Sequence, residues 1–174
     1  VAYHLANTTY TRNNLAGGGS DSNTMPNFYS GLTISLGFPD DWSAITMPYL
    51  AIESGDINVS AETINTSFDS TAPGYTEESY ELTIWGFAGG TTYAGQPDYA
   101  ANRLQRKRLI ADLIALFDDH AIDIRVENST PPVSLGDGEP TNVSAENIPP
   151  STGMEADQNR FRVNFTLLVS RFSE

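Results

Sequence analysis

The chain has no cysteine among its 174 residues. This absence excludes disulfide bonds, thiolate zinc sites and a cysteine nucleophile. Long apolar runs are also missing: the longest covers only a few residues, whereas a helix that crosses a bilayer needs about 20. The N-terminus has no basic-then-apolar signal pattern. These absences predict a soluble chain that has no membrane partner.

Basic residues are scarce, with nine Lys and Arg against 22 Asp and Glu and a formal net charge of -13. Lys107 is the only lysine. Such a charge repels itself at low ionic strength and is tolerated best where concentrated salt screens it. Arginine suits salt because guanidinium is weakly hydrated and pairs bidentately. We interpret the composition as an adaptation to brine; the alternative is an ordinary acidic protein that happens to lack lysine.

Four of the nine basic residues fall within six consecutive positions: Arg103, Arg106, Lys107 and Arg108. Uniform negative charge elsewhere disfavours wrapping of nucleic acid, so any phosphate contact must be local. Three interpretations of this cationic cluster stay open. It is a solvated face that pairs with nearby acids, a contact with an acidic surface of a neighbouring subunit, or a phosphate contact in a ring lumen. The acids considered for the first interpretation are Asp98, Asp112, Glu77 and Glu78.

Period-two alternation predicts strands over residues 32–38, 47–53 and 80–88, with further alternation over 57–61. Pro48 places the second strand at a sheet edge or near the strand start. Ser/Thr-rich residues that lead to Pro73 and Gly74 indicate a turn. We therefore expect a long hairpin with a solvated tip and a base in the core, and its return strand should be covered on both faces near Trp85.

Pro97 and Asp98 predict the start of the longest helix. A helical wheel places six apolar residues on one arc that should pack on the sheet: Leu109, Ile110, Leu113, Ile114, Leu116 and Phe117. The same wheel puts Arg103, Arg106 and Lys107 on this arc and Arg108 away from it. The helix is therefore expected to overhang its sheet, and a second copy would complete the burial.

We expect a single α/β domain of the α+β kind over residues 31–174, with a mostly antiparallel sheet and one major helix packed on one face. Residues 1–30 are polar and glycine-interrupted, and predict a flexible or interlocking N-terminal arm. A short strand is predicted over 122–127, and a clearly alternating closing strand is predicted from Arg160 onward. The proline-rich residues 129–159 predict a long loop excursion between them.

Candidate chemistry is sparse. The two histidines, His4 and His120, lie in no recognisable catalytic frame, and Asp118 and Asp119 with His120 indicate a solvated helix end rather than a cation site. We expect no enzyme activity, no catalytic residue, no metal site and no cofactor. A carboxylate-dependent hydrolase, using the pairs Asp40–Asp41 or Glu77–Glu78, is the less favoured alternative. A surface glycan-binding or receptor-binding module is another, with four aromatic platforms: Trp42, Tyr49, Tyr75 and Tyr93.

The order of these motifs resembles a known family. The segments that carry the resemblance are the edge strand Met47-Pro48-Tyr49-Leu50-Ala51-Ile52-Glu53, the strand Tyr80-Glu81-Leu82-Thr83-Ile84-Trp85-Gly86-Phe87-Ala88, the helix from Arg103 to Phe117, the strand from Ile122 to Glu127, and Arg160-Phe161-Arg162. Together they resemble the tail-terminator and neck-completion proteins of long-tailed viruses, and the acid excess resembles a virus of a halophilic archaeal host. The resemblance covers roughly residues 45–128 and 160–172.

The resemblance implies a non-enzymatic structural virion protein whose copies form a ring, expected to be hexameric, that caps the tail tube beneath the head. Its partners would be other copies, the tail-tube protein and head–tail connector proteins, with passing contact to DNA in the lumen. It would be assembled in the host cytoplasm and located in the virion neck. The usual opening helix is not evident in residues 1–30, and the 129–159 excursion is long, so another head–tail connector or tail component is an alternative.

Overall fold

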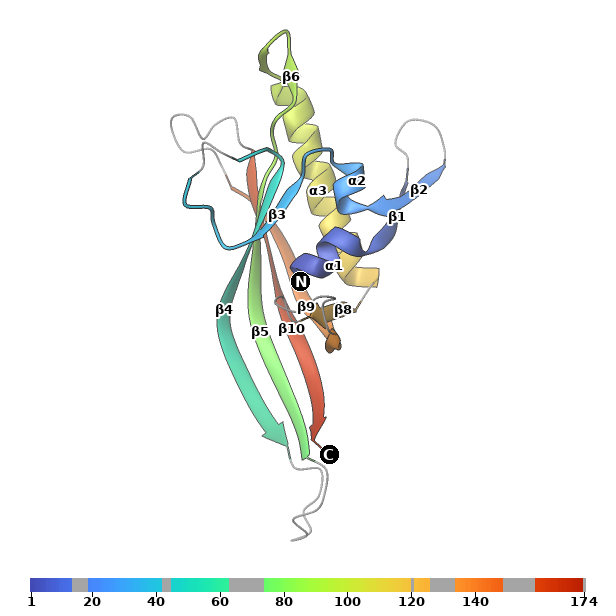
Figure 1. Cartoon of the computed structure of the whole chain (residues 1–174), viewed down its shortest axis with the longest axis vertical. Helices are drawn as coiled ribbons and strands as arrows, with labels where there is room; N and C mark the ends of the chain where they lie inside the picture. The colour runs from blue at the N-terminus through green and yellow to red at the C-terminus, as the bar shows by residue number, and fades with distance from the viewer. Residues whose placement is uncertain are drawn as a thin grey trace.

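A computed structural model describes residues 1–13, 19–41, 45–62, 74–119, 121–125, 134–148 and 159–173. It is an α+β fold in which one major helix packs on one face of a six-stranded sheet (Figure 1). The sheet is antiparallel except where β3 pairs with β4. The predicted fold class, sheet type and helix placement are confirmed.

The strands of the central sheet lie in the order β3-β4-β5-β10-β9-β8. Four of them are 14 residues long, which far exceeds the usual five or six. The bounds of all six strands are β3 Thr33–Leu36, β4 Tyr49–Glu62, β5 Gly74–Phe87, β8 Ile122–Arg125, β9 Ser134–Asn147 and β10 Arg160–Ser173. A small hairpin, β6 Thr92–Tyr93 with β7 Gln96–Pro97, stands above the sheet next to the start of α3 (Figure 1).

Strands β4 and β5 form the predicted long hairpin, paired from Tyr49 opposite Phe87 to Glu62 opposite Tyr75. The two alternating segments expected in 47–53 and 57–61 belong to a single strand, β4. Its pairing with β5 shifts register at a bulge between Ser54 and Ile57. The base of the hairpin is in the core, as expected. The tip lies in residues 63–73, outside the described residues.

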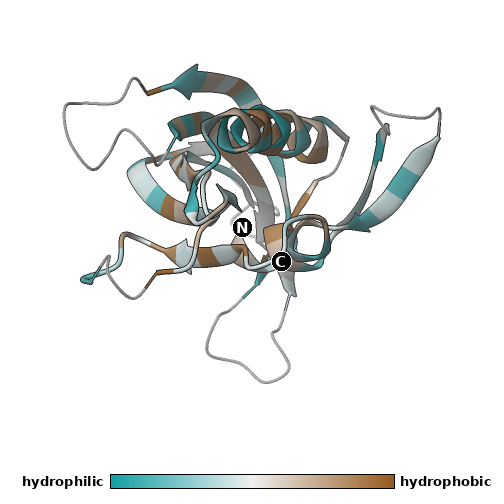
Figure 2. Ribbon diagram, turned by 90° about the horizontal axis from the view of Figure 1, so that it is seen from above, coloured by the Kyte–Doolittle hydropathy of each residue, from teal (hydrophilic) through white to brown (hydrophobic). Residues whose placement is uncertain are grey.

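The sheet buries residues on both faces. The larger core lies between the sheet and α3, Tyr99–Asp119, and its most buried members include Leu50, Ile84, Leu109, Leu113, Leu116, Phe161 and Val163. A smaller cluster covers the other face, made by Tyr49, Ala51 and Phe87 with Ile45, Met47 and Trp85 against them. The expectation that the end of β5 is covered on both sides is confirmed. Figure 2 shows hydrophobic residues on the strands under α3.

Gly86 allows the closest approach in this core. It lies opposite Phe161 in the β5–β10 register, and the ring of Phe161 occupies the space above it. A Cβ atom at position 86 would stand 2.0 Å from Phe161 Cζ, which is far inside van der Waals contact. A side chain at this position would therefore displace the Phe161 ring, which is 0% exposed.

Residues 1–30 differ from the expectation of a polar arm without packed elements. They form α1 Ala2–Asn7, β1 Thr9–Asn13, β2 Ser20–Thr24 and α2 Met25–Phe28. Four apolar side chains from this N-terminal layer are buried with the main core: Leu5, Tyr10, Met25 and Tyr29. The far end of the hydrophilic hairpin β1–β2 projects from the body (Figures 1 and 2). Four widely spaced apolar residues were too weak a periodic signal to predict this packing.

Residues 129–159 also differ from expectation, because the predicted loop contains β9. Pro140 fits this strand because β8 pairs with β9 only between Ser134 and Gly138. Beyond Gly138 the outer edge of β9 has no partner strand in the described residues, so Pro140 lies on an edge segment, where a sheet tolerates proline best. Asn142 has a positive φ of 53° at the bulge where β9 shifts register against β10.

Candidate functional site

The first half of α3 is anchored to the backbone of the turn that follows β5. Asp98 caps the helix: its Oδ1 accepts the N–H of Ala101 at 3.0 Å. One turn further on, Asn102 Oδ1 accepts the N–H of Thr91 at 3.1 Å. Gln105 Oε1 accepts the N–H of Gly89, also at 3.1 Å. Polar side chains therefore face inward in this half of the helix. In the second half, the inward positions are apolar, as at Leu109 and Leu113.

These anchors correct the wheel prediction for the cationic cluster. Arg103 and Lys107 are exposed rather than inward, Arg106 is half-buried at the border, and Arg108 is exposed. Ile114, predicted on the buried arc, is 39% exposed. The true inward line runs through Asn102, Leu109 and Leu116. A wheel built on apolar residues alone could not place it, because Asn102 is 2% exposed and polar.

The cluster differs in its partners from three arginines elsewhere in the chain. Arg12 lies 3.5 Å from Asp112, Arg125 pairs with Asp123, and Arg162 lies 2.6 Å from Glu146. Within the described part of the chain, none of the four cluster cations makes an ion pair. Arg103 Nε instead donates to the carbonyl of Tyr99 at 3.3 Å, and Arg106 Nε is buried without a hydrogen-bond partner.

Three of the four acids expected to neutralise the cluster accept hydrogen bonds from other groups of the described chain. Asp98 caps α3, and Glu78 accepts a hydrogen bond from Tyr80. Asp112 is 7% exposed and its Oδ2 accepts the hydroxyls of Tyr10 at 2.8 Å and Tyr29 at 2.6 Å. The interpretation of the cluster as a solvated face paired with these acids finds no support in the described contacts.

The tyrosine–carboxylate network fastens the N-terminal layer to α3, and the sequence interpretation missed it. Burial and the hydrogen bonds to Asp112 raise the pKa of both Tyr10 and Tyr29 above the usual range of tyrosine. The guanidinium of Arg12 lies 3.8 Å from the centre of the Phe28 ring, which holds it over the layer. An acid on the inward side of α3, between Leu109 and Leu113, was the signal that could have pointed to buried partners.

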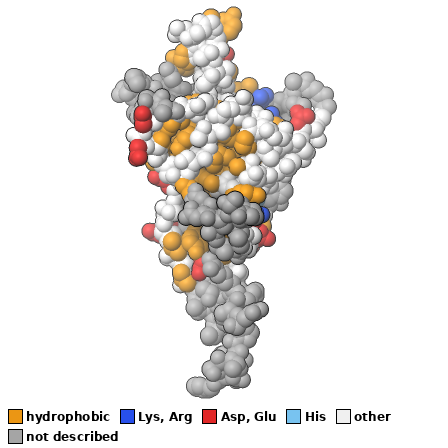
Figure 3. All heavy atoms as spheres, viewed as in Figure 1, with side chains coloured by type: hydrophobic (Ala, Val, Ile, Leu, Met, Phe, Trp, Pro, Cys, Tyr) orange, Lys and Arg blue, Asp and Glu red, His pale blue; other side chains and the backbone are white. Residues whose placement is uncertain are grey.

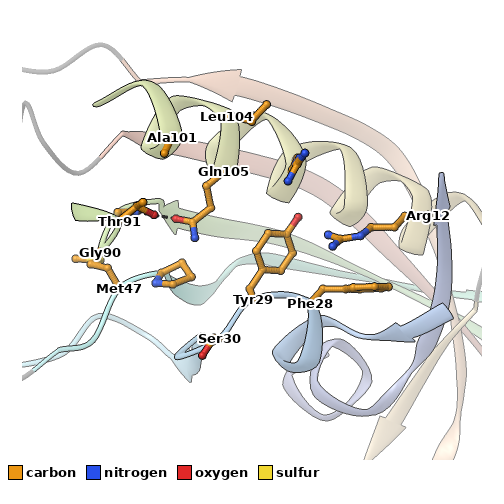
Figure 4. A pocket seen from close by; sticks show the side chains of 13 residues that line it. Arg12, Phe28, Tyr29, Ser30, Met47, Gly90, Thr91, Ala101, Leu104 and Gln105 are labelled. Atoms are coloured by element: carbon orange, nitrogen blue, oxygen red, sulfur yellow. Dashed lines mark hydrogen bonds between the residues drawn. The ribbon is translucent and has the colours of Figure 1, made fainter. Parts of the chain in front are cut away.

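A cleft of about 380 Å³ lies between this layer and the first half of α3 (Figure 4). Arg12, Phe28 and Tyr29 line one side, and Leu104 and Gln105 line the helix side. Arg108 belongs to the same lining, so the cleft opens beside the cationic cluster. Two arginines, Arg12 and Arg108, are among its lining residues and no Asp or Glu is, so the cleft suits an acidic group better than a basic one.

A second cavity of about 670 Å³ lies between the last half of α3 and β9, lined by Ile114, Phe117, Pro140 and Val143 among others. No described group of three or more His, Asp or Glu side chains could hold a metal ion. His4 is 4% exposed and its Nδ1 lies 3.1 Å from the Thr8 hydroxyl. The other histidine, His120, lies outside the described residues.

The four aromatic platforms are not equivalent in the structure. Tyr49 is 2% exposed within the smaller core, so it cannot present a ring to a ligand, which corrects that part of the prediction. Tyr93 at the β6–β7 hairpin is 79% exposed. Trp42 lies outside the described residues, as does the Tyr75 side chain.

No protein-family model matches the chain, and no curated protein is significantly similar to it. None of the helices in the described ranges has the length and apolar character that a membrane crossing requires.

Proposed function

We propose that this chain is a structural virion protein, the subunit of a tail-terminator ring that caps the tail tube and joins it to the head or neck. The host would be a halophilic archaeon, as the charge of -13 suggests. Support comes first from the motif order and from a small α+β subunit whose helix and sheet both carry uncovered surface. The same observations support another head–tail connector or tail component as the nearest alternative.

The observation that carries the proposal is the unmatched cationic cluster. A chain with 22 acids and nine bases has ample carboxylates to pair every cation, and Arg12, Arg125 and Arg162 are paired. The cluster makes no such pair in the described residues. Arginine is enriched in protein interfaces, and the same patch on every copy can meet a different patch on the next, which closes a ring when the rotation allows it.

In this proposal the contact is made by Arg103, Arg106, Lys107 and Arg108. Salt shortens the reach of charge to about 3 Å at 1 M, so the contact depends on direct bidentate pairs and burial rather than on long-range attraction. DNA would make only passing contact in the lumen, because the acidic chain opposes phosphate binding. The ring would be a homo-oligomer, expected to be a hexamer, that binds the tail-tube and connector proteins.

The test is the mass of the protein in multimolar salt, measured by light scattering after gel filtration and by mass photometry. Wild-type protein is expected to assemble, whereas Arg103→Glu and Arg106→Glu should weaken assembly and leave the circular dichroism spectrum unchanged. Arg162→Glu is the matched control, since it reverses a charge on the sheet outside the cluster. A monomeric wild type, or normal rings from both cluster variants, contradicts the proposal.

The neighbouring genes separate a terminator from other ring proteins. Portal, tail-tube and tape-measure reading frames beside this one are expected. Their absence from the surrounding genome would contradict a role in the tail.

The glycan-binding or receptor-binding alternative is favoured by one feature, the exposed ring of Tyr93. Binding of the isolated monomer to a glycan array, lost in Tyr93→Ala, would support this alternative over the ring.

A further inference from the structure

The lower end of the β4–β5 hairpin carries apolar side chains that nothing in the described part of the chain covers. We call residues 54–59 of β4 and 77–82 of β5 the tongue. Ile57 is 58% exposed and Val59 is 62% exposed. They lie opposite Tyr80 and Glu78 in the register, so they continue the face that buries Ile84 against α3 higher up.

The tongue is also a free sheet edge. Strand β3 pairs with β4 only as far as Leu36 opposite Ile52, and beyond Ile52 no described strand flanks β4. The same face is covered on β10, where Leu167 and Val169 are both 4% exposed. Figure 3 shows hydrophobic and acidic side chains together at this lower end. On this face, the exposed apolar side chains therefore lie on β4, at the free edge of the sheet, and not on β10.

The charge of the tongue has one sign. Its two segments contain four acids, Asp56, Glu77, Glu78 and Glu81, and no Lys or Arg. A surface that combines exposed apolar side chains with one sign of charge fits a partner that has exposed apolar side chains and the opposite charge.

The first half of α3 is such a surface. Leu104 is 45% exposed and Tyr99 is 52% exposed, and the exposed cations Arg103, Lys107 and Arg108 lie beside them. Between Tyr99 and Ala111 the helix has no acid. The two surfaces therefore match in apolar character and are opposite in charge.

One copy cannot bring these surfaces together. The first half of α3 lies at the upper end of the molecule, beside β6, and the tongue lies at the lower end (Figure 1). We infer that the tongue of one copy docks on the cationic half of α3 in a second copy, with Ile57 and Val59 facing Leu104, and with Glu78, which lies opposite Val59 on the same face, facing the cluster. The contact is head-to-tail, so each copy offers both halves of it.

This inference rests on the proposed ring, for which it names the partner of the cationic cluster. Its experiment uses two charge-reversed full-length proteins. The tongue variant carries Asp56→Lys and Glu78→Lys, and the helix variant carries Arg103→Glu and Lys107→Glu. Each should fail to assemble alone, because its exchanged residues then meet residues of like charge on the unchanged surface of the next copy. Mixed at equal concentration they should assemble, because the tongue of each now matches the helix of the other.

The apolar half of the contact has its own variant, Ile57→Ser with Val59→Ser. We expect the protein concentration at half-assembly to rise about tenfold or more, as a loss of roughly 1.4 kcal/mol would produce. Leu36→Ser, which changes a side chain of similar exposure, 54%, on β3, is the matched control and should assemble like wild type. Glu139→Lys on β9 is the charge control.

The outcomes separate the two proposals. A wild type that stays monomeric in multimolar salt overturns the ring and the docking contact together. If the wild type assembles and the helix variant fails while the tongue variants assemble normally, the ring stands and the docking contact is overturned. Failure of the two charge-reversed proteins to assemble when mixed also overturns the docking contact. Circular dichroism of each variant shows that it is folded before its mass is compared.

Discussion

The upper and lower halves of strand β4 have the same alternation of apolar residues but opposite burial. In the upper half Leu50 is 0% exposed and Ile52 is 5% exposed. In the lower half Ile57 and Val59 lie on the continued core face and are mostly exposed. The difference is the cover: α3 and the N-terminal layer lie over the upper half, and the tongue extends below them (Figure 1). Alternation therefore decides which face is apolar, and the covering element decides whether that face is buried.

The two halves of α3 also differ in the contacts that hold them. In the second half Leu113 and Leu116 pack on the sheet, whereas in the first half Asn102 and Gln105 bond the backbone at Thr91 and Gly89. The first half is thus held by hydrogen bonds to a turn and leaves its cations outward. Four stability measurements test this contrast between covered and uncovered regions.

The largest effect is expected in the covered half. Ile84→Ala removes a side chain that is 0% exposed, and a truncation of this kind costs about 2–5 kcal/mol through lost burial and the remaining cavity. Urea unfolding at fixed high salt measures the change. A loss below about 1 kcal/mol would show that the upper half of the sheet is not the tightly packed region we describe.

Gly86→Ala tests the close approach in the same region. Its new Cβ would stand 2.0 Å from Phe161 Cζ, and overpacking of this kind costs about 1–3 kcal/mol. Thermal unfolding of Gly86→Ala, Phe161→Leu and the double variant forms a cycle. The double variant should lose less stability than the two single losses added together; simple additivity would contradict the contact.

Alkaline pH should loosen the N-terminal layer. Since burial and Asp112 raise the pKa of Tyr10 and Tyr29 in the folded state, the unfolded chain releases protons first above about pH 10. The contribution of the two tyrosines to the free energy of unfolding is therefore fully present below that pH. It falls as pH rises, by up to about 1.4 kcal/mol per pH unit for each tyrosine. Unfolding measured from pH 8 to 11.5 should show a shallower fall in Tyr10→Phe. Equal slopes in both proteins would refute the network.

The smallest effect is expected in the tongue. Ile57→Ala changes a side chain that is 58% exposed, so the unfolding free energy of the monomer should change by less than about 0.5 kcal/mol. Measurement at protein concentrations below assembly isolates the monomer. A loss comparable to that of Ile84→Ala would mean that the tongue is covered within one chain.

Much of the sheet could be predicted because strand signals are local. The closing strand, with Phe161, Val163 and Phe165 buried, follows directly from alternation, as does the β4–β5 hairpin. The helix was predictable from Asp98 and its apolar arc. These features depend on side chains that are neighbours in sequence or repeat at a fixed period.

The candidate site could be predicted only in part. The cationic cluster is visible in sequence as a local run, but the exposure of Arg103 and the inward position of Asn102 depend on hydrogen bonds to the Gly89–Thr91 backbone. The Tyr10–Asp112 bond joins residues 102 positions apart, and no local pattern specifies such a pair. The β9 strand was missed because Pro140 and Gly138 read as loop residues, although an edge position and close packing on Leu167 accommodate them.

The sequence alone determined the charge, the absence of cysteine chemistry, the alternating strands and one amphipathic helix, because these are properties of residue type and spacing. Tertiary packing sets which apolar faces are covered, which acids are already engaged and which cations make no ion pair within the described chain. Burial and ion pairing depend on the elements that lie opposite each side chain, and those elements come from distant parts of the chain.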